Sequence, residues 1–191
     1  MKHMVRNLPP QIIVWDVEMT AWEGSHDRDW NGEGEYKEII QIGAIKVDTE
    51  TLTEIESFNL LVRPTVNPIL SNYIQKFTGI TQNDIDTQGV SPQGAVSQLF
   101  SWAGDVPFYS WGRLDREALE ATIQLNDLDF HVPANRFRSI RCVFKDSGIP
   151  ADRYMNSTII QAFGMEQKRQ GHNGLNDART ILDASRALAE R

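Results

Sequence analysis

Carboxylate groups in three widely separated segments constrain the fold of this chain more than any other feature. Asp16 and Glu18 lie in the segment IIVWDVEMT near the N-terminus, Asp115 lies mid-chain, and Asp177 lies near the C-terminus. Hard divalent cations prefer oxygen ligands, and such ions can catalyse the cleavage of phosphodiester bonds. These four residues form one metal site only if the fold brings both ends and the middle of the chain together.

The size and composition of the chain favour one ordinary globular domain. Its 191 residues are 40% apolar and 24% charged, and we expect one domain over residues 1–191 with its core at about 11–188. Cys142 has no second cysteine to pair with, which favours a reducing, cytoplasmic setting. The N-terminus lacks the pattern of a signal peptide, and no apolar run is long enough to span a membrane. A net charge of −7 argues against nonspecific coating of nucleic acid by a polycation.

The order of the elements indicates an α/β protein with a mixed β-sheet flanked by helices. Apolar, β-branched runs predict strands, amphipathic stretches predict helices, and the polar, glycine-containing residues 23–38 predict a long loop. Ser91 and Pro92 mark the start of one helix as N-cap and first helical residue. The expected strands are 11–18, 39–48, 53–62 and 106–111, and the expected helices are 69–77, 92–103, 113–125, part of 138–147, and 175–190.

Each candidate residue also has a simpler explanation. Asp16 and Glu18 project from the same side of a strand, so they indicate either a cation between them or two solvated acids at a strand end. Asp115 and Asp177 each lie in the first turn of a predicted helix, where an acid also complements the helix dipole. His172 lies in a glycine-flanked loop, where it is either solvated or placed to accept a proton from water near neutral pH.

Taken in order, these residues resemble the motifs of the DEDD superfamily of 3′–5′ exonucleases, in its histidine-bearing branch (DEDDh). Asp16 and Glu18 match the first motif, Asp115 matches the second, and His172 with Asp177 matches the third. That branch includes ribonuclease T and the proofreading subunit of bacterial DNA polymerase III.

Further segments extend the resemblance to nearly the whole chain. The tyrosine branch has its tyrosine where this chain has Asn173, so His172 indicates the histidine branch. The segment IIQIGAIKVD resembles the second strand of the family, and FTGIT at 77–81 resembles the segment that borders the 3′ end of the substrate. The segment DVEMTAWEGS is most similar to bacterial relatives of the 3′ histone-mRNA exonucleases.

The resemblance implies a ribonuclease H-like fold and a two-metal mechanism. It implies that Asp16 bridges two Mg²⁺ or Mn²⁺ ions, that Glu18 and Asp177 hold the metal that binds the attacking water, and that Asp115 supports the second ion. His172 is then the general base. The implied substrates are the 3′ ends of single-stranded RNA or DNA, and the implied products are nucleoside 5′-monophosphates. The sequence distinguishes neither RNA from DNA nor a monomer from an oligomer.

Substrate-binding residues are also implied, chiefly by the resemblance. Met19 and Thr20 would line the sugar of the terminal nucleotide, and aromatic side chains would stack on terminal bases. For Trp111, which follows a predicted buried strand, a place in the core is the stronger interpretation. The full set of candidate substrate contacts is Met19, Thr20, Trp22, Phe77, Thr78, Gly79 and Trp111.

A basic run gives one more candidate surface. Arg136, Arg138, Arg141 and Lys145 occur without intervening acids. On a helix, the last three share a face, which would hold phosphates of the incoming strand or be a solvated helix face. A non-catalytic binding module on the same fold is the alternative function, and the complete set of four acids and one histidine argues against it.

Overall fold

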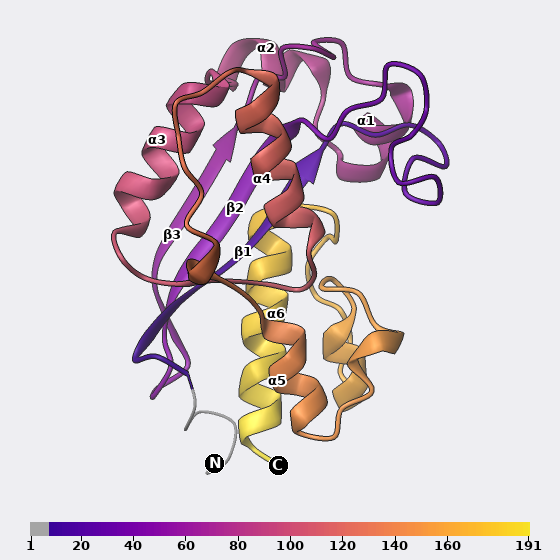
Figure 1. Cartoon of the computed structure of the whole chain (residues 1–191). Coiled ribbons are helices and arrows are strands. Elements are labelled where there is room, and N and C mark those ends of the chain that lie inside the picture. The colour runs from indigo at the N-terminus through magenta and orange to yellow at the C-terminus, as the bar shows by residue number, and fades with distance from the viewer. Residues whose placement is uncertain (1–7) are drawn as a thin grey trace.

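A five-stranded mixed sheet forms the centre of the computed structural model, which describes residues 8–191 (Figure 1). Residues 1–7, where the sequence shows no signal-peptide pattern, lie outside the described range. The strand order is β3-β2-β1-β4-β5. The strands are β1 (Gln11–Met19), β2 (Ile39–Asp48), β3 (Thr53–Leu61), β4 (Phe108–Ser110) and β5 (Phe137–Ser139). The first three strands form an antiparallel meander, and β4 and β5 continue the sheet in parallel with β1.

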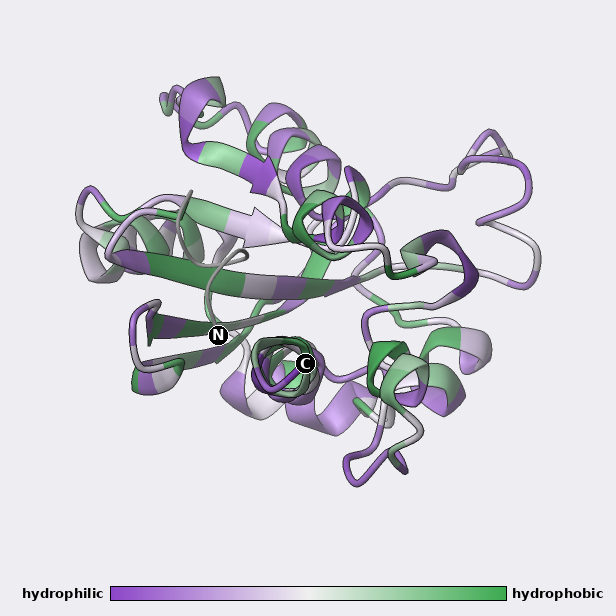
Figure 2. Cartoon of the chain, turned by 90° about the horizontal axis from the view of Figure 1, so that it is seen from below, coloured by the Kyte–Doolittle hydropathy of each residue, from purple (hydrophilic) through white to green (hydrophobic). Residues whose placement is uncertain are grey.

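Helices cover both faces of the sheet (Figure 2). The helices α3 (Pro92–Ala103) and α4 (Leu114–Leu125) share one apolar cluster with the odd-numbered residues of β1, among them Ile13 and Trp15. The opposite cluster joins even-numbered residues of β1 to α5 (Ile140–Asp146) and α6 (Gly174–Ala189). Because side chains alternate along a strand, the even-numbered Asp16 and Glu18 face α6.

The remaining elements are short. Two helices, α1 (Asn72–Thr78) and α2 (Gln82–Gln88), follow β3 and form a third, smaller apolar cluster with Ile40 of β2 and with loop residues. In the described part of the chain, 3-10 helices lie in the connections at η2 (Ala134–Arg136), η3 (Ala151–Arg153) and η4 (Ile159–Phe163). None of the helices in residues 8–191 is long and apolar enough to cross a membrane.

Capping residues explain where the predicted helices begin and end. The Ser91 side chain accepts a hydrogen bond from the Gly94 N–H and Pro92 opens α3, as predicted. The helix expected at 69–77 begins three residues later, because Ser71 is its N-cap and accepts from the Ile74 N–H. The helix expected within 138–147 covers Ile140–Asp146 and is preceded by β5, which the sequence analysis did not predict.

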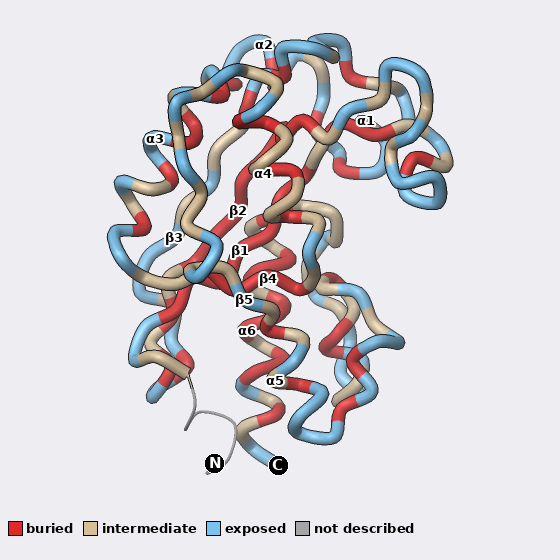
Figure 3. The backbone as a smooth tube through the Cα atoms, viewed as in Figure 1, coloured by how far each residue is buried: buried red, intermediate tan, exposed pale blue. Residues whose placement is uncertain are grey.

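The predicted loop at 23–38 is ordered by its own polar contacts. Arg28 forms an ion pair with Glu35, and the Trp30 Nε1–H donates to the Thr20 carbonyl oxygen at 2.8 Å. Most of the loop backbone is exposed, in contrast to the buried sheet (Figure 3). Lys37 ties the loop to α4 through the Glu117 carboxylate at 3.2 Å.

Candidate active site

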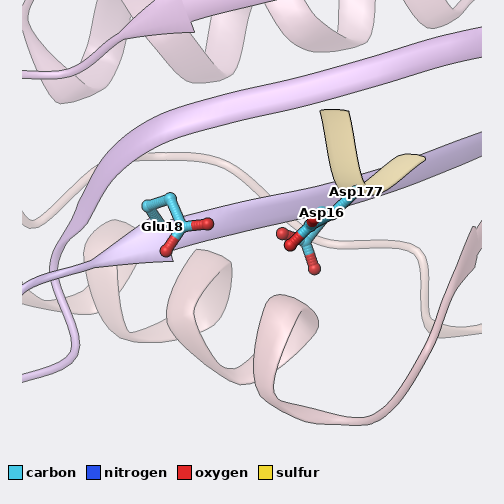
Figure 4. A group of neighbouring side chains, drawn as sticks. All are labelled: Asp16, Glu18 and Asp177. Atoms are coloured by element: carbon cyan, nitrogen blue, oxygen red, sulfur yellow. The ribbon is translucent and has the colours of Figure 1, made fainter. Parts of the chain in front are cut away.

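Three carboxylates from opposite ends of the chain meet on one face of the sheet. Asp16 and Glu18 project from the last residues of β1, and Asp177 approaches them from the first turn of α6 (Figure 4). One oxygen atom from each of the three side chains lies within 4.8 Å of the others. All three side chains are buried, and Asp177 is only 1% exposed. The fold thus brings together the first and third carboxylate segments predicted from the sequence.

Two glycines allow α6 to approach the sheet this closely. A Cβ atom on Gly43 of β2 would lie 1.9 Å from the Leu175 backbone nitrogen, and one on Gly174 would lie 2.7 Å from the Asp16 carbonyl oxygen. The Gln41 Oε1 atom accepts a hydrogen bond from the Gly174 N–H at 3.0 Å, which fixes the start of the helix. Sequence analysis did not assign a role to Gly43, although a glycine inside a strand is a known sign of close backbone approach.

Asp115 reaches the site from a third element. It is buried in the first turn of α4, and its Oδ1 atom accepts a hydrogen bond from the Val17 N–H at 3.1 Å. Val17 lies between Asp16 and Glu18 on β1, so this bond places Asp115 beside both carboxylates. The structure therefore gathers all four acids that the sequence analysis selected.

Burial and mutual repulsion make these carboxylates poor anions in the metal-free protein. Burial raises the pKa of Asp16 well above its ordinary value, and the charges of Asp115, Glu18 and Asp177 raise it further. Burial and the charge of Asp177 likewise raise the pKa of Glu18 well above its ordinary value. Burial raises the pKa of Asp115 to about 6 and that of Asp177 to about 7. The cluster therefore carries its full negative charge at neutral pH only if cations compensate it.

The donor set fits a hard divalent cation. Its members are carboxylate oxygens, which suit Mg²⁺ or Mn²⁺ better than zinc. The Asp177 Oδ1 atom is buried and has no hydrogen-bond partner among the described residues, and a buried polar atom without a partner is costly unless a ligand satisfies it. The Asn156 Nδ2–H donates to the Asp16 Oδ1 atom at 2.5 Å and orients that carboxylate. Sequence analysis missed Asn156, because it lies in an irregular segment far from every motif.

His172 borders the carboxylates through its backbone. Its N–H donates to the Asp177 Oδ2 atom at 3.2 Å, and its φ of 58° is unusual for a residue other than glycine. The imidazole packs against Phe77, with 3.8 Å between ring centroids. Burial lowers the pKa of His172, which favours the neutral ring that a base requires.

The residues predicted to contact the terminal nucleotide fall into two groups. Phe77 is 40% exposed beside His172 and also stacks on Tyr73, and Met19 and Trp22 are half-buried. Gly79 is exposed and ends α1 as its C-cap, with a φ of +78°. These four positions remain candidate substrate contacts.

The side chains of the other three have structural partners. The Thr20 hydroxyl donates to the Tyr36 carbonyl oxygen and accepts from the Glu38 N–H, and the Thr78 hydroxyl donates to the Ile74 carbonyl oxygen. Trp111 is 8% exposed, packs on Phe144 in the core, and donates from Nε1 to the Tyr154 carbonyl oxygen. For Trp111 the structure therefore supports the core interpretation rather than base stacking.

The four residues of the basic run between Arg136 and Lys145 also divide into one with structural partners and three that line the surface. The Arg136 guanidinium donates to the carbonyl oxygens of Gly104 and Val106 and lies over the Phe100 and Phe108 rings, so it stabilises the fold. The other three cationic side chains line a surface hollow next to α4.

Comparison with known families agrees with this geometry. The Exonuclease family model (RNase_T) matches residues 13–184, nearly the whole described chain. The chain belongs to the RNase T exonuclease family. A human relative, 3′–5′ exoribonuclease 1, is 27% identical over 180 residues, which cover 89% of the present chain and 50% of the human protein. The probable 3′–5′ exonuclease KapD of Bacillus subtilis (strain 168) is 25% identical over 122 residues, covering 62% of this chain and 56% of KapD. The chain thus spans about half the length of these curated relatives.

Solved structures of other nucleases share its fold. The nuclease domain of 3′hExo, a DEDDh family member bound to rAMP, superposes with a TM-score of 0.81 at 23% identity, covering 97% of the present chain and 94% of that domain. Escherichia coli exonuclease I in complex with a dA16 oligonucleotide gives a TM-score of 0.68 at 14% identity, over 96% and 41% of the two chains. The predicted ribonuclease H-like mixed sheet and the predicted DEDDh resemblance are confirmed.

Proposed function

We propose that this chain is a metal-dependent 3′–5′ exonuclease that removes nucleotides from the 3′ ends of single-stranded RNA or DNA and releases nucleoside 5′-monophosphates. One observation carries the proposal: four buried carboxylates from β1, α4 and α6 converge, and one of their oxygens has no partner among the described residues. A cluster that is unfavourable without cations is expected where cations perform the reaction.

The relatives support the proposed 3′–5′ direction of degradation. The human relative is a 3′–5′ exoribonuclease, and the fold neighbours include one nuclease domain bound to rAMP and one exonuclease bound to a dA16 oligonucleotide. Both kinds of nucleic acid therefore fit this fold, and the proposal includes both. The lone cysteine supports a reducing compartment, and we propose a cytoplasmic location on that basis.

Asp16, Glu18 and Asp177 would hold one divalent cation, and Asp115 would help Asp16 hold a second. We propose Mg²⁺ or Mn²⁺, because every available donor is an oxygen atom. When bound, such ions supply charge stabilisation at the reacting phosphate and lower the pKa of water. Asn156 keeps Asp16 in its orientation through the bond to Oδ1, and Val17 does the same for Asp115.

His172 would act as the general base. Its half-buried imidazole is favoured in the neutral form, so one ring nitrogen can take a proton from the attacking water. The backbone bond from His172 to Asp177 keeps the residue beside the carboxylates while the ring remains free of hydrogen bonds within the described chain. Phe77, Met19, Trp22 and Gly79 would border the terminal nucleotide.

The direct test is degradation of an oligonucleotide labelled at its 5′ end, with Mg²⁺ or Mn²⁺ present. The wild-type protein should produce a ladder that shortens from the 3′ end, and a circular substrate should resist cleavage. Asp177→Asn should abolish the ladder, because it removes the unpartnered charged oxygen. The matched control is Asp146→Asn, an exposed aspartate at the end of α5, which should keep full activity. Full activity of Asp177→Asn would refute the site.

Calorimetric titration with Mn²⁺ distinguishes the enzyme from a non-catalytic binding module. The proposed enzyme should bind Mn²⁺ with a Kd between micromolar and millimolar, and the affinity should fall in Asp177→Asn. A wild-type protein that binds oligonucleotide but not Mn²⁺ would be a binding module.

A further inference from the structure

A groove lined by basic side chains begins beside the carboxylates. It has a volume of about 540 Å³ and lies between α4 and the β5–α5 segment. We call it the α4–α5 groove. Its cationic lining residues are Arg113, the residue that precedes α4, Arg116 of α4, and Arg138, Arg141 and Lys145 of the β5–α5 segment. In a chain with a net charge of −7, this local concentration of positive charge marks a surface for an anionic partner.

The groove is continuous with the proposed active site. The first turn of α4 carries Asp115 on its buried side and Arg116 on the groove side. Ser110 and Ser139, the last residues of β4 and β5, also line the groove. Because β1, β4 and β5 are parallel, their carboxyl ends lie along one edge of the sheet, which is where open α/β sheets bind ligands. Figure 1 shows α4 above α5.

The two walls of the groove differ in charge. On the α4 wall, Arg113 pairs with Glu117 and Arg116 pairs with Glu120, so each cation has an acid four residues along the chain. On the opposite wall, Arg138 has no carboxylate partner within the described chain. Arg141 and Lys145 have only Asp152, at 3.7 and 2.8 Å, and this aspartate is 61% exposed. Exposed ion pairs of this kind contribute little to the stability of the protein. A substrate phosphate can therefore replace Asp152 as the partner of these two cations at little cost in free energy.

We infer that the α4–α5 groove binds the phosphodiester backbone of the substrate strand on the 5′ side of the nucleotide being removed, through Arg138, Arg141 and Lys145. This inference rests on the proposed function, since it places more of the same substrate. It accounts for the basic residues that the catalytic site does not use. It also implies that kcat/KM depends on the length of the strand. A dinucleotide reaches the carboxylates without filling the groove, whereas a longer strand occupies both the carboxylate site and the groove.

The test compares a dinucleotide with a single-stranded 12-mer at several salt concentrations. The triple variant Arg138→Gln, Arg141→Gln, Lys145→Gln should lower kcat/KM on the 12-mer by roughly 10- to 100-fold at 0.1 M salt, because three phosphate contacts are lost. Its kcat/KM on the dinucleotide should change less than twofold. The logarithmic salt slope of 12-mer binding should become shallower by about 2, since each single-strand phosphate contact contributes about 0.7.

Single variants separate charge from folding effects. Arg138→Gln is exposed and breaks no ion pair, so it should fold normally and lower kcat/KM on the 12-mer alone. Its matched control is Lys168→Gln, which makes the same change in net charge at an exposed lysine that lines a different hollow. An unchanged 12-mer rate and salt slope in Arg138→Gln and the triple variant would overturn the inference. So would an equal loss on both substrates.

Failure of the proposed function would look different. A wild-type protein that releases no nucleotide from either substrate refutes the exonuclease activity. Fluorescence anisotropy with a 12-mer whose last linkage cannot be hydrolysed still tests the groove in that case. A salt slope that is the same in the wild-type protein and the triple variant would then refute the groove independently.

Discussion

His172 interacts with the site in two separate ways, through its backbone and through its side chain. Its backbone N–H is bonded to Asp177, while its imidazole rests on Phe77 without a hydrogen bond within the described residues. The backbone therefore helps to orient a ligand, and the ring is available for proton transfer. Truncation of the side chain removes only the second contribution.

We predict that His172→Ala lowers kcat by roughly 10²- to 10⁴-fold, the usual contribution of a general base. The Kd for Mn²⁺, measured by calorimetry, should stay within about twofold, because the His172 N–H remains in place. His131→Ala, at an exposed histidine far along the chain from every motif, is the control and should retain full activity. Equal losses of activity and Mn²⁺ affinity in His172→Ala would argue for a structural role instead.

Asn156 orients a ligand from a distance of 140 residues along the sequence. We predict that Asn156→Ala weakens Mn²⁺ binding or lowers kcat/KM by roughly 10- to 100-fold, as is usual when a residue that supports a metal ligand is removed. Asn135→Ala, at an exposed asparagine in η2, should change neither quantity. Unchanged Mn²⁺ affinity and rate in Asn156→Ala would show that Asp16 holds its orientation without help.

Sequence analysis predicts the roles of some residues of the site and misses those of others. Asp16, Glu18, Asp115 and Asp177 belong to motifs with a fixed order, so the sequence predicts that they converge, and they do. Asn156 belongs to no motif, and its role depends on the path of an irregular segment. Thr20 and Trp111 illustrate the converse, because a motif does not reveal whether a side chain points to the substrate or to the interior.

At the scale of elements, the contact between β2 and α6 determines whether the site forms. Gly43 and Gly174 let the two backbones approach without side chains between them. The helix start is thereby held close enough for Asp177 to reach the carboxylates of β1. A side chain at either position would move the helix and its ligand together.

We predict that Gly43→Ala destabilises the fold by about 1–3 kcal/mol or more, since its new methyl group would overlap the Leu175 backbone nitrogen. Urea unfolding measures this change, and Mn²⁺ binding should weaken in parallel. Gly112→Ala is the control, because a Cβ atom there meets nothing within 4 Å. A Gly43→Ala protein with wild-type stability and Mn²⁺ affinity would show that α6 has room to move.

The elements that sequence analysis found are those with strong local signals. The Ser91 cap and Pro92 define the start of α3, and long β-branched runs define β1 and β2. The helix α2 was missed because QNDIDTQ has a single apolar residue that becomes buried, Ile85. The strand β5 was missed because three residues are too few for a periodic pattern, and its pairing with β4 depends on the whole fold.

At the scale of the whole molecule, the carboxylate cluster opposes folding when no cation is present. The folded protein raises the pKa of Asp115 to about 6 and that of Asp177 to about 7, above the ordinary value of 3.8. The folded state therefore holds protons that the unfolded state has released. Stability of the metal-free protein should then decrease as pH rises through this window.

We predict that the metal-free protein loses about 1 kcal/mol of stability between pH 6.5 and 8 through Asp177 and Asp115 alone, and the raised pKa values of Asp16 and Glu18 act in the same direction. This corresponds to a decrease of about 2–4 °C in Tm, measured calorimetrically in a chelator. The lowered pKa of His172 opposes this decrease by at most about 0.4 kcal/mol, because half of the unfolded-state histidine is still protonated at its ordinary pKa of 6.5. Mn²⁺ at pH 8 should restore the Tm, and Asp177→Asn should flatten the dependence on pH. A metal-free Tm that rises from pH 6.5 to 8 would contradict the prediction.

The position of Asp177 on α6 has a consequence for biosynthesis. Among the described elements, α6 comes last in the chain, and the approach at Gly43 and Gly174 exists only after it has packed against the sheet. A chain still emerging from the ribosome therefore lacks one of its proposed metal ligands, however well its first 170 residues have folded. On the proposed function, translation itself delays the activity, and the enzyme acquires the ability to degrade RNA only after its own messenger has been read through this helix.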